Sequence, residues 1–423
     1  MNIISTCRRG LLLWMAILLA LPVVVHGQDW TQFRGPTGQG VSSVKSVPLK
    51  WGEDSDNLTW KTPIEGLGWS SPSVQGDRIW LTTAADEGQS LRAVSLDLTT
   101  GKEMLNVEVF KLAEPGKVHS KNSHASPTPV IEGDRVYLHF GNYGTACIST
   151  AGEVLWRHVF EYNHRHGPGG SPVIFEDLLI INCDGTDVQF IAALNKNTGE
   201  EVWRTKRAHI SEARLSGADS APMGFSTPLL VEVDGVMQVV STGGDHVAGY
   251  NARTGEEIWW SSYYGYSLVP RPVVGHGMIY VCSGYNKPMM YAIRLGGTGD
   301  VTETHVEWTL ERGAPHNPSP LIVGDEIYIV ADRGVAMCLD AKTGEEHWQQ
   351  RLGGNFSASP LLAAGRIYFL NETGETIVVE PGVEYKELAR NQVEGRTLAS
   401  LTPLEAAMLL RTDTHLYRFD QPK

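Results

Sequence analysis

Cysteine is scarce in this chain, with five among 423 residues, which is too few for a scaffold built on disulfides. One of them, Cys7, lies in the first 27 residues. The others stand in apolar, strand-like runs, where buried free thiols are the expected state, although one bridge between structural units stays open. They are Cys147, Cys183, Cys282 and Cys338.

Long apolar runs are missing after residue 27. Before it, Arg8 and Arg9 precede an apolar run from Leu11 to Val25 and a small-residue site ending at Gly27, which predicts that residues 1–27 are a removable export signal. A retained signal anchor is the alternative, but about 15 apolar residues are short of the roughly 20 that span a bilayer. We therefore expect an exported mature chain, 28–423, in the periplasm or outside the cell, with no transmembrane span. Cleavage would leave Gln28 rather than a cysteine, so no lipid anchor is expected.

Basic residues are outnumbered. The chain has 35 Lys and Arg against 48 Asp and Glu, and removal of the signal with its two arginines leaves 33 − 48 = −15. This balance argues against nucleic acid or anionic lipid as the main partner.

Helical periodicity and the common catalytic motifs are also missing. No Gly-Lys-Ser phosphate loop, GxSxG elbow or HExxH helix is present. Only Ala113–Val118 and Ser211–Ala218 are compatible with a short helical turn.

What is present is a repeat of 40 to 56 residues. Each unit opens with a small residue and a proline, followed by an apolar strand, a Gly or Asp turn and a second strand. A second phrase follows, in which a Thr-Gly-Glu turn joins two further strands, as before Trp203 and Trp348. The anchor prolines are Pro72, Pro127, Pro172, Pro228, Pro272, Pro320, Pro360 and Pro403.

Eight units of four antiparallel strands predict an all-β fold, an eight-bladed β-propeller forming a single domain over 28–423. The last unit lacks an outer strand, and the segment around Trp60 precedes the first anchor, so we expect this N-terminal strand to close the ring in the last blade. The outer-strand side chains are expected to pack between blades. They are Trp60, Trp156, Trp203, Trp259, Trp308, Trp348, Tyr385 and, in the first unit, Met104.

The two faces of such a propeller differ in sequence. If the strands of a blade are labelled A to D, the A–B and C–D turns share one face and are short, whereas the B–C and D–A connections share the other and are long. Binding residues tend to lie on loops held by a rigid scaffold. We therefore expect the binding site on the B–C/D–A face.

Polar residues just before the inner strands should surround the central channel of that face. Imidazole, amide and guanidinium groups there would suit an anionic or hydroxyl-rich ligand, and bonding to blade backbone and channel water is the alternative. The candidates are Asn122, His124, His166, Arg271, His316, Asn317 and Asn355.

Other loop residues are weaker candidates. His164 and His166 alone cannot complete a metal site, so no metal is predicted. Asp184 with Asp187, or Asp245 with His246, could bind a ligand or serve acid–base chemistry, but these residue types are also ordinary turn formers. No catalytic residue is predicted.

The repeated phrases, such as Leu339 to Trp348 after a Ser-Pro anchor, resemble the pyrroloquinoline-quinone-like propeller repeat family over nearly all of the mature chain. The segments Asp29–Pro36 and Thr412–Phe419 resemble those of exported planctomycete propellers. The resemblance implies the fold and an exported location. It leaves the function open, because the family includes quinoprotein dehydrogenases and the assembly lipoprotein BamB.

Quinoprotein alcohol dehydrogenases of this family use two adjacent cysteines beside the quinone and a calcium ion held by Glu, Asn and Asp. This sequence has no adjacent cysteines and no matching calcium motif, so pyrroloquinoline quinone with calcium is not supported by motif. We therefore expect a non-catalytic scaffold or binding module in the cell envelope, with a protein or saccharide partner. A quinone-dependent oxidoreductase is the alternative.

Overall fold

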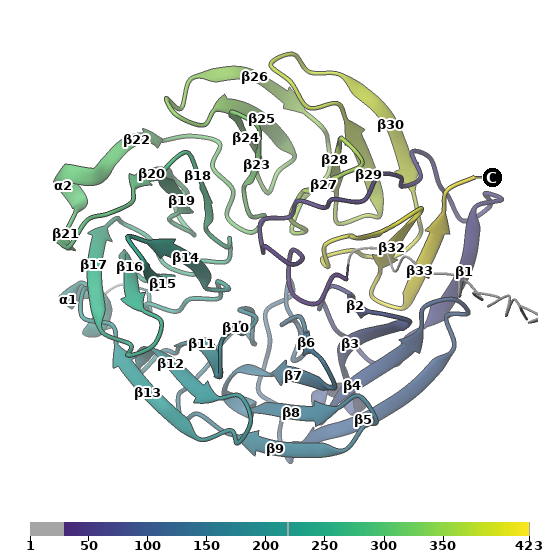
Figure 1. Ribbon diagram of the computed structural model, residues 1–423, viewed down its shortest axis with the longest axis horizontal. Coiled ribbons are helices and arrows are strands. Elements are labelled where there is room, and N and C mark those ends of the chain that lie inside the picture. Colours follow the sequence, from purple (N-terminus) through teal and green to yellow (C-terminus); the bar gives the residue numbers. More distant parts are fainter. Residues whose placement is uncertain (1–28, 218–219, 423) are drawn as a thin grey trace, which may run out of the picture.

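Residues 29–217 and 220–422 are described by the computed structural model, and the predicted export signal, residues 1–27, lies outside them. In the described part, the strands form eight sheets around a central axis (Figure 1). Seven sheets have four strands, and the remaining one has a short fifth. The predicted eight-bladed β-propeller of antiparallel blades is confirmed.

Blades 1 to 4 follow the chain from the innermost strand outward. Blade 1 comprises β2 (Ser73–Gln75), β3 (Arg78–Ala85), β4 (Ser90–Asp97) and β5 (Glu103–Lys111). Blade 2 comprises β6 (Val130–Glu132), β7 (Arg135–His139), β8 (Thr145–Ser149) and β9 (Val154–His158). Blade 3 comprises β10 (Val173–Phe175), β11 (Leu178–Asp184), β12 (Gln189–Asn195) and β13 (Glu201–Lys206). Blade 4 comprises β14 (Leu229–Val233), β15 (Val236–Gly243), β16 (His246–Asn251) and β17 (Glu257–Ser262), with β21 (Gly299–Asp300) parallel to β17.

Blades 5 to 8 complete the ring. Blade 5 comprises β18 (Val273–Gly275), β19 (Met278–Cys282), β20 (Met290–Arg294) and β22 (Val306–Leu310). Blade 6 comprises β23 (Leu321–Val323), β24 (Glu326–Val330), β25 (Val335–Asp340) and β26 (Glu346–Arg351). Blade 7 comprises β27 (Leu361–Ala363), β28 (Arg366–Leu370), β29 (Glu375–Val379) and β30 (Glu387–Gln392). Blade 8 comprises β31 (Thr402–Leu404), β32 (Ala407–Arg411) and β33 (His415–Asp420), with β1 (Leu58–Pro63) as its outer strand.

The ring closes as the sequence predicts. Strand β1 pairs antiparallel with β33, from Leu58 opposite Phe419 to Pro63 opposite His415. Both ends of the propeller chain therefore meet in one sheet, so the ring leaves no open sheet edge between its first and last blades.

Helical structure is confined to single turns. One predicted turn is confirmed, because α1 (Glu212–Leu215) lies within Ser211–Ala218, but the prediction for Ala113–Val118 is wrong. That segment has no repeating backbone hydrogen bonds, and the N–H and carbonyl of Gly116 bond the side chains of Tyr143 and His124 instead. Three short turns were not predicted: α2 (Thr302–His305) and the 3-10 turns η1 (Asp86–Gly88) and η2 (Gly141–Tyr143).

The hydrophobic core lies between neighbouring blades. A cluster containing Tyr137, Trp156, Leu179 and Phe190, for example, joins blades 2 and 3. The four cysteines of the described chain, at 147, 183, 282 and 338, are free and buried in such clusters. Buried free thiols are thus confirmed, and the open possibility of an inter-blade disulfide is wrong, since all four thiols are free, even Cys147 and Cys183, which share one cluster.

The outer-strand tryptophans clamp one blade to the next. The Trp156 indole donates to the Lys196 carbonyl of blade 3 at 3.0 Å. Its ring lies against Gly199, where an added Cβ would come within 2.6 Å of it and φ is +77°. The glycine of the Thr-Gly-Glu turn thus makes room for the neighbouring indole. Packing between blades is confirmed, and the same contact recurs for Trp60 on Gly101, Trp203 on Gly255 and Trp308 on Gly344.

Two of the predicted outer-strand positions are wrong. Leu105, not Met104, occupies the tryptophan position of blade 1, since it lies opposite Ser95 as Trp156 lies opposite Cys147. Met104 is 45% exposed, because side chains alternate along a strand.

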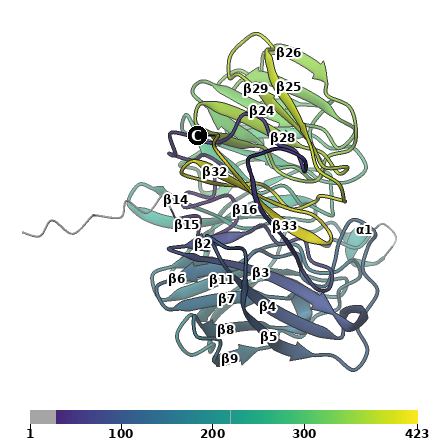
Figure 2. The same ribbon diagram turned by 90° about the vertical axis from the view of Figure 1, so that its right-hand side faces the viewer.

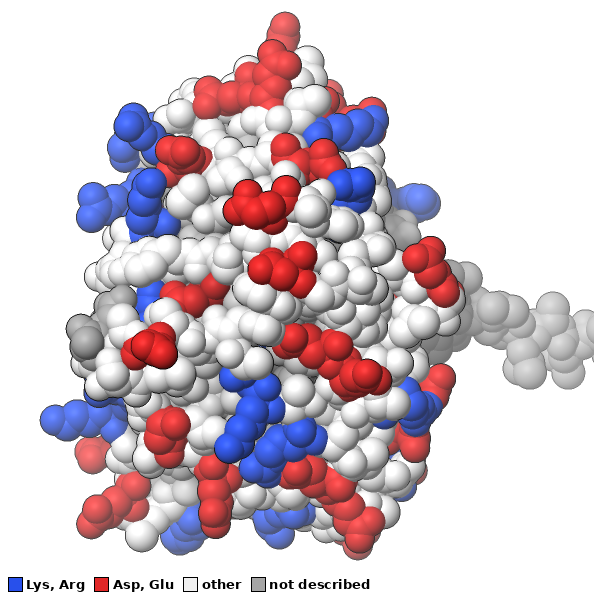
Figure 3. Space-filling view, turned by 90° about the vertical axis from the view of Figure 1, so that its left-hand side faces the viewer, with Lys and Arg blue, Asp and Glu red and all other residues white. Residues whose placement is uncertain are grey.

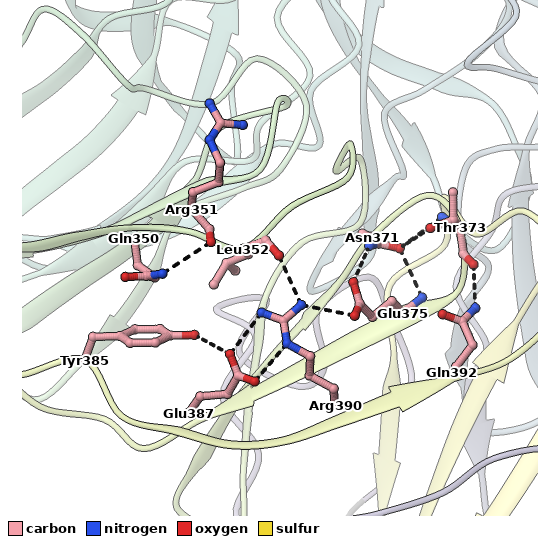
Figure 4. A network of polar contacts seen from close by, with 10 residues as sticks. All are labelled: Gln350, Arg351, Leu352, Asn371, Thr373, Glu375, Tyr385, Glu387, Arg390 and Gln392. Carbon is pink, nitrogen blue, oxygen red and sulfur yellow. Dashed lines mark hydrogen bonds and ion pairs between the residues drawn. The ribbon is translucent and has the colours of Figure 1, made fainter.

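In blade 7 the equivalent residue is Ala389, opposite Val378, whereas Tyr385 precedes β30 and packs on the Trp348 ring at 5.2 Å. A polar network ties this outer strand down (Figure 4). Arg390 bonds Glu387 and Glu375 and donates to the Leu352 carbonyl at 3.1 Å.

The two faces of the propeller are visible from the side. In Figure 2 the β14–β15 hairpin projects on one side and α1, in a D–A connection, on the other. Figure 3 shows acidic side chains spread over the outer surface, with Lys and Arg in smaller groups between them. In the described residues no helix has the length and apolar character that a membrane crossing needs.

Candidate functional site

A ring of hydrogen bonds surrounds the central channel. In seven blades the second residue before the innermost strand is Ser or Thr, and its hydroxyl accepts a backbone N–H from the preceding blade at 2.9–3.1 Å. These bonds join neighbouring blades through residues at the same position of each repeat, which makes the channel wall rigid. The ring residues are Ser71, Thr128, Ser171, Thr227, Ser319, Ser359 and Ser400.

This ring corrects two of the predicted anchors. Thr128 is followed by Pro129, and β6 begins at the next residue, so Pro129 rather than Pro127 is the anchor of blade 2. In blade 8 the anchor position is held by Leu401, and Pro403 lies within β31. In blade 2 the anchor lies in a Pro-x-Pro sequence, Pro127 to Pro129, and proline spacing alone does not tell which of the two prolines is the anchor.

Arg271 replaces the ring hydroxyl in blade 5. Its backbone N–H continues the ring to Ser319, but its guanidinium turns to the chain's own N-terminal segment and donates to the Phe33 carbonyl at 3.0 Å. The side chain is buried, and burial lowers its pKa to about 10. The predicted ligand-binding residue Arg271 therefore holds a part of the protein itself.

That N-terminal segment, residues 29–42, crosses the channel and is called the plug here. It is the dark purple chain at the centre of Figure 1. It bonds blades far apart in the ring: the Thr31 carbonyl accepts the N–H of Ile131, the Gln39 side chain accepts that of Val274, and the N–H of Ser42 donates to Leu362. These contacts lie at the middle residues of the innermost strands, which follow the ring hydroxyls toward the A–B turns, so the plug closes the channel on the A–B side of the ring.

A second arginine secures the plug from within. Arg34 donates to the carbonyls of Gln39 and Pro320, each at 2.7 Å, and is 3% exposed. Burial, together with the charge of Arg271, lowers its pKa to about 9. Two buried guanidinium groups that bond carbonyls rather than carboxylates make the plug costly to remove, because each would lose its acceptors.

Above the plug a funnel of about 760 Å³ opens to the B–C/D–A face. All eight blades contribute to its wall, and Phe33 of the plug forms part of the floor. The wall combines aromatic rings (Trp69, Phe225, Tyr266, Tyr285), amides (Asn122, Asn317, Asn355), imidazoles (His119, His166, His316), the charged side chains of Lys121, Arg333 and Asp332, and the ring hydroxyls. This size and mixture are typical of a small-molecule site.

Five of the predicted residues meet in this funnel. They are Asn122, His166, His316, Asn317 and Asn355. Their binding role stays a prediction, but the convergence of D–A connections on the channel is as expected. His124 does not line the funnel: its Nε2 bonds the Gly116 carbonyl at 2.6 Å and its ring packs on Tyr143.

Asp184 and Asp187 do not act on a common group. Asp184 is buried and forms an ion pair with Arg207, whose Nε lies 2.6 Å from Oδ1 and whose Nη2 lies 2.9 Å from Oδ2. Burial lowers the pKa of Arg207, but the Asp184 carboxylate outweighs this and raises it above its usual value. Asp187 is exposed and caps the Asn163 backbone N–H at 2.8 Å.

Asp245 and His246 are likewise separated by their partners. Asp245 accepts from Ser211 and Arg214, both at 2.6 Å. His246 bonds the Gly244 carbonyl through Nδ1, and burial lowers its pKa to about 3. Both belong to the wall of blade 4 and neither lines the funnel.

The carboxylate of the funnel wall, Asp332, is occupied by its own blade. It accepts the backbone N–H of His316 at 2.7 Å, that of Asn317 at 3.3 Å and the Asn317 amide. Burial lowers the pKa of His316, which keeps this imidazole neutral at pH 7. The Asp332 carboxylate therefore orders the loop that presents His316 and Asn317.

The loop of blade 2 between residues 112 and 122 leans over the mouth. Lys121 forms an ion pair with Glu372 of blade 7 at 2.7 Å, and Arg396 of blade 8 donates to the Ser120 carbonyl at 2.7 Å. The Arg396 guanidinium also lies over the Trp69 ring, 5.6 Å from its centroid. Sequence spacing missed these cross-channel contacts and the aromatic wall, since the partners come from blades remote in sequence.

A metal site is not formed by these groups. Across residues 29–217 and 220–422, no three His, Cys, Asp or Glu side chains are placed to hold one ion. His164 and His166 both pack against the Phe225 ring, at 5.2 and 6.2 Å between centroids.

A family model described as outer membrane protein assembly factor BamB matches four overlapping stretches of this chain, 41–181, 145–265, 187–328 and 305–382. Together they cover more than half of it. The chain belongs to this BamB propeller family. Each match spans several blades, which agrees with the repeat seen in the structure.

Curated relatives match part of the chain. The chain is 25% identical over 209 residues to a 1-butanol dehydrogenase (quinone) of Thauera butanivorans and 26% identical over 211 residues to a quinoprotein ethanol dehydrogenase of Pseudomonas aeruginosa. Each alignment covers 44% of this chain and 32% of the relative, so the chain spans about a third of the curated relatives it matches. A europium-containing methanol dehydrogenase has the same fold, with a TM-score of 0.52 at 11% identity over 92% of this chain and 90% of that one.

Proposed function

We propose that this BamB-family chain is an exported, non-catalytic binding module of the cell envelope, which takes a hydroxyl-rich ligand into its blind funnel. The observation that carries the proposal is the funnel itself, with its rigid ring, its closed floor and a wall of aromatic rings and amides. Aromatic faces with a few placed polar groups suit ligands that are apolar on one side and hydroxylated on the other.

Catalysis has less support. A general base needs a reachable proton acceptor near a nucleophile or water. The wall carboxylate, Asp332, already accepts three hydrogen bonds, and Asp184 and Asp245 pair with arginines outside the funnel.

The experiment is a screen of the purified mature protein on an oligosaccharide array, compared with an Asn355→Trp variant. Asn355 is exposed on the funnel wall, so tryptophan there fills the cavity without disturbing the core. Asn197→Trp is the matched control, since Asn197 is exposed on a C–D turn of the opposite face. Binding that Asn355→Trp abolishes and Asn197→Trp retains supports the proposal. Binding unaffected by both, or capture of envelope proteins only, refutes it.

A quinone-dependent oxidoreductase is the second candidate, favoured by the two dehydrogenase relatives. The residues present do not fit calcium with pyrroloquinoline quinone. Calcium takes six to eight oxygen ligands, whereas the lining contributes the carboxylate of Asp332, which is already engaged, and no two cysteines are adjacent. Titration with the quinone and calcium should therefore give no thermal shift and no dye-linked alcohol oxidation. A saturable shift with turnover would establish the oxidoreductase instead.

A further inference from the structure

The charge of the funnel is opposite to that of the protein. The chain carries a formal charge of −13 with neutral histidines, yet its funnel is lined by Lys121 and Arg333 against one carboxylate. That carboxylate, Asp332, faces its own loop. A cationic hollow in an acidic surface concentrates anions locally.

Two cations of this region have no carboxylate partner among the described residues. Arg333 is exposed on the wall, and no Asp or Glu of the described chain lies within ion-pair distance of it. Arg396 bonds a backbone carbonyl and stacks over Trp69. An arginine fork is well suited to a carboxylate, which it binds through two parallel hydrogen bonds.

The neutral part of the wall suits sugar rings. Tyr266 and Tyr285 of blade 5 present aromatic surface, and Tyr285 is 50% exposed, whereas Trp69 is 6% exposed and lies under Arg396. Amides offer donors and acceptors together, which match sugar hydroxyls. They stand at Asn122, Asn317 and Asn355 on blades 2, 6 and 7.

We propose that the funnel binds the end of an acidic saccharide, with a sugar face on Tyr285 and a carboxylate on Arg333. This inference rests on the proposed binding function and names its ligand class. Aromatic stacking alone would admit neutral sugars equally well. Arg333, which has no carboxylate partner among the described residues, is what selects the charged ones.

The test uses trigalacturonic acid and its methyl ester, which has the same sugars without the charges, in titration calorimetry with the mature protein. The acid should bind at least about tenfold more tightly than the ester, and added salt should weaken it. Arg333→Gln should weaken the acid about three- to tenfold and leave the ester unchanged. Arg253→Gln, an exposed arginine paired with Asp177 away from the funnel, is the control and should have no effect.

Each failure has its own meaning. Equal binding of acid and ester, or no effect of Arg333→Gln, overturns the acidic class and leaves a saccharide-binding funnel. Binding of hexa-aspartate as tight as that of the acid overturns the saccharide class, because the funnel then reads charge alone. If neither saccharide binds and the array is empty, the proposed function itself fails.

Discussion

Removing the charge of Asp184 should destabilise the whole propeller. In Asp184→Asn the Arg207 guanidinium stays fully buried, bonded to Ser241 at 2.6 Å but without its counter-ion. Breaking a buried pair from one side costs about 3–5 kcal/mol, since a buried charge is left uncompensated. With an unfolding entropy of about 2.1 cal/mol/K per residue, roughly 400 residues give about 0.8 kcal/mol/K, so the melting temperature should fall by about 4–6 °C.

The assay is thermal and urea unfolding followed by circular dichroism. Asp187→Asn is the matched control in the same loop, because Asp187 is exposed and bonds only nearby backbone and amide groups. Its cost should stay below about 1 kcal/mol. If both variants melt alike, Arg207 is neutralised by other means and the argument from burial is refuted.

Three further predictions follow from the same contacts. Trp156→Ala should lower the free energy of unfolding, measured in urea, by about 3–5 kcal/mol. Leu105→Ala at the same position of blade 1 should cost clearly less, because Leu105 is half-buried and makes no indole hydrogen bond. Equal losses would contradict the role of Trp156 in joining the blades. Arg271→Ser should speed amide hydrogen exchange in the plug without unfolding the blades, because the Phe33 carbonyl loses its hydrogen-bond donor. Unchanged exchange would mean that the plug stays bound without Arg271. Burial lowers the pKa of His139 to about 3 and that of His164 to about 4, so these imidazoles stay neutral when folded but charge when unfolded. The free energy of unfolding should therefore fall by roughly 2 kcal/mol per histidine when the pH is lowered from above 6.5 to 5. A melting temperature that does not change over this pH range would refute the prediction.

The repeat predicted the fold because each blade buries the same positions. The period, the Thr-Gly-Glu turns and the outer tryptophans all express one packing unit, which is why eight blades and the closing strand could be read from the sequence. The errors arose within units. Glu103-Met104-Leu105 has the spacing of Glu201-Val202-Trp203, and a β-bulge places the third residue of each between blades. Counting from the glutamate would have identified Leu105.

The same spacing identifies Ala389 two residues after Glu387, so the aromatic at Tyr385 misled the prediction. The prediction followed the preference for an aromatic residue at this position, but the strand register decides which side chain faces the next blade.

The funnel was predictable in place but not in detail. The order of strands fixes which connections share a face, so Asn122, His166 and His316 were expected near the channel and lie there. The sequence predicts ligand contacts for Asp184 and Arg271 because it does not reveal the partners that these side chains have in the fold. Arg207 lies 23 residues away from Asp184, and Phe33 is 238 residues away from Arg271. The sequence does contain one clue: Arg271 stands at the position where the seven other blades have Ser or Thr.

The plug decides what kind of ligand the funnel can accept. An open channel would let a polymer thread through the propeller, whereas a floor at Phe33 held by Arg34 and Arg271 stops any chain that enters. Only the end of a chain, or a small molecule, can then contact all eight blades at once. For a saccharide, affinity should rise with length until the cavity of about 760 Å³ is filled and then stay constant. Affinity that continued to rise with longer chains would place the binding surface across the loops outside, and not in the funnel.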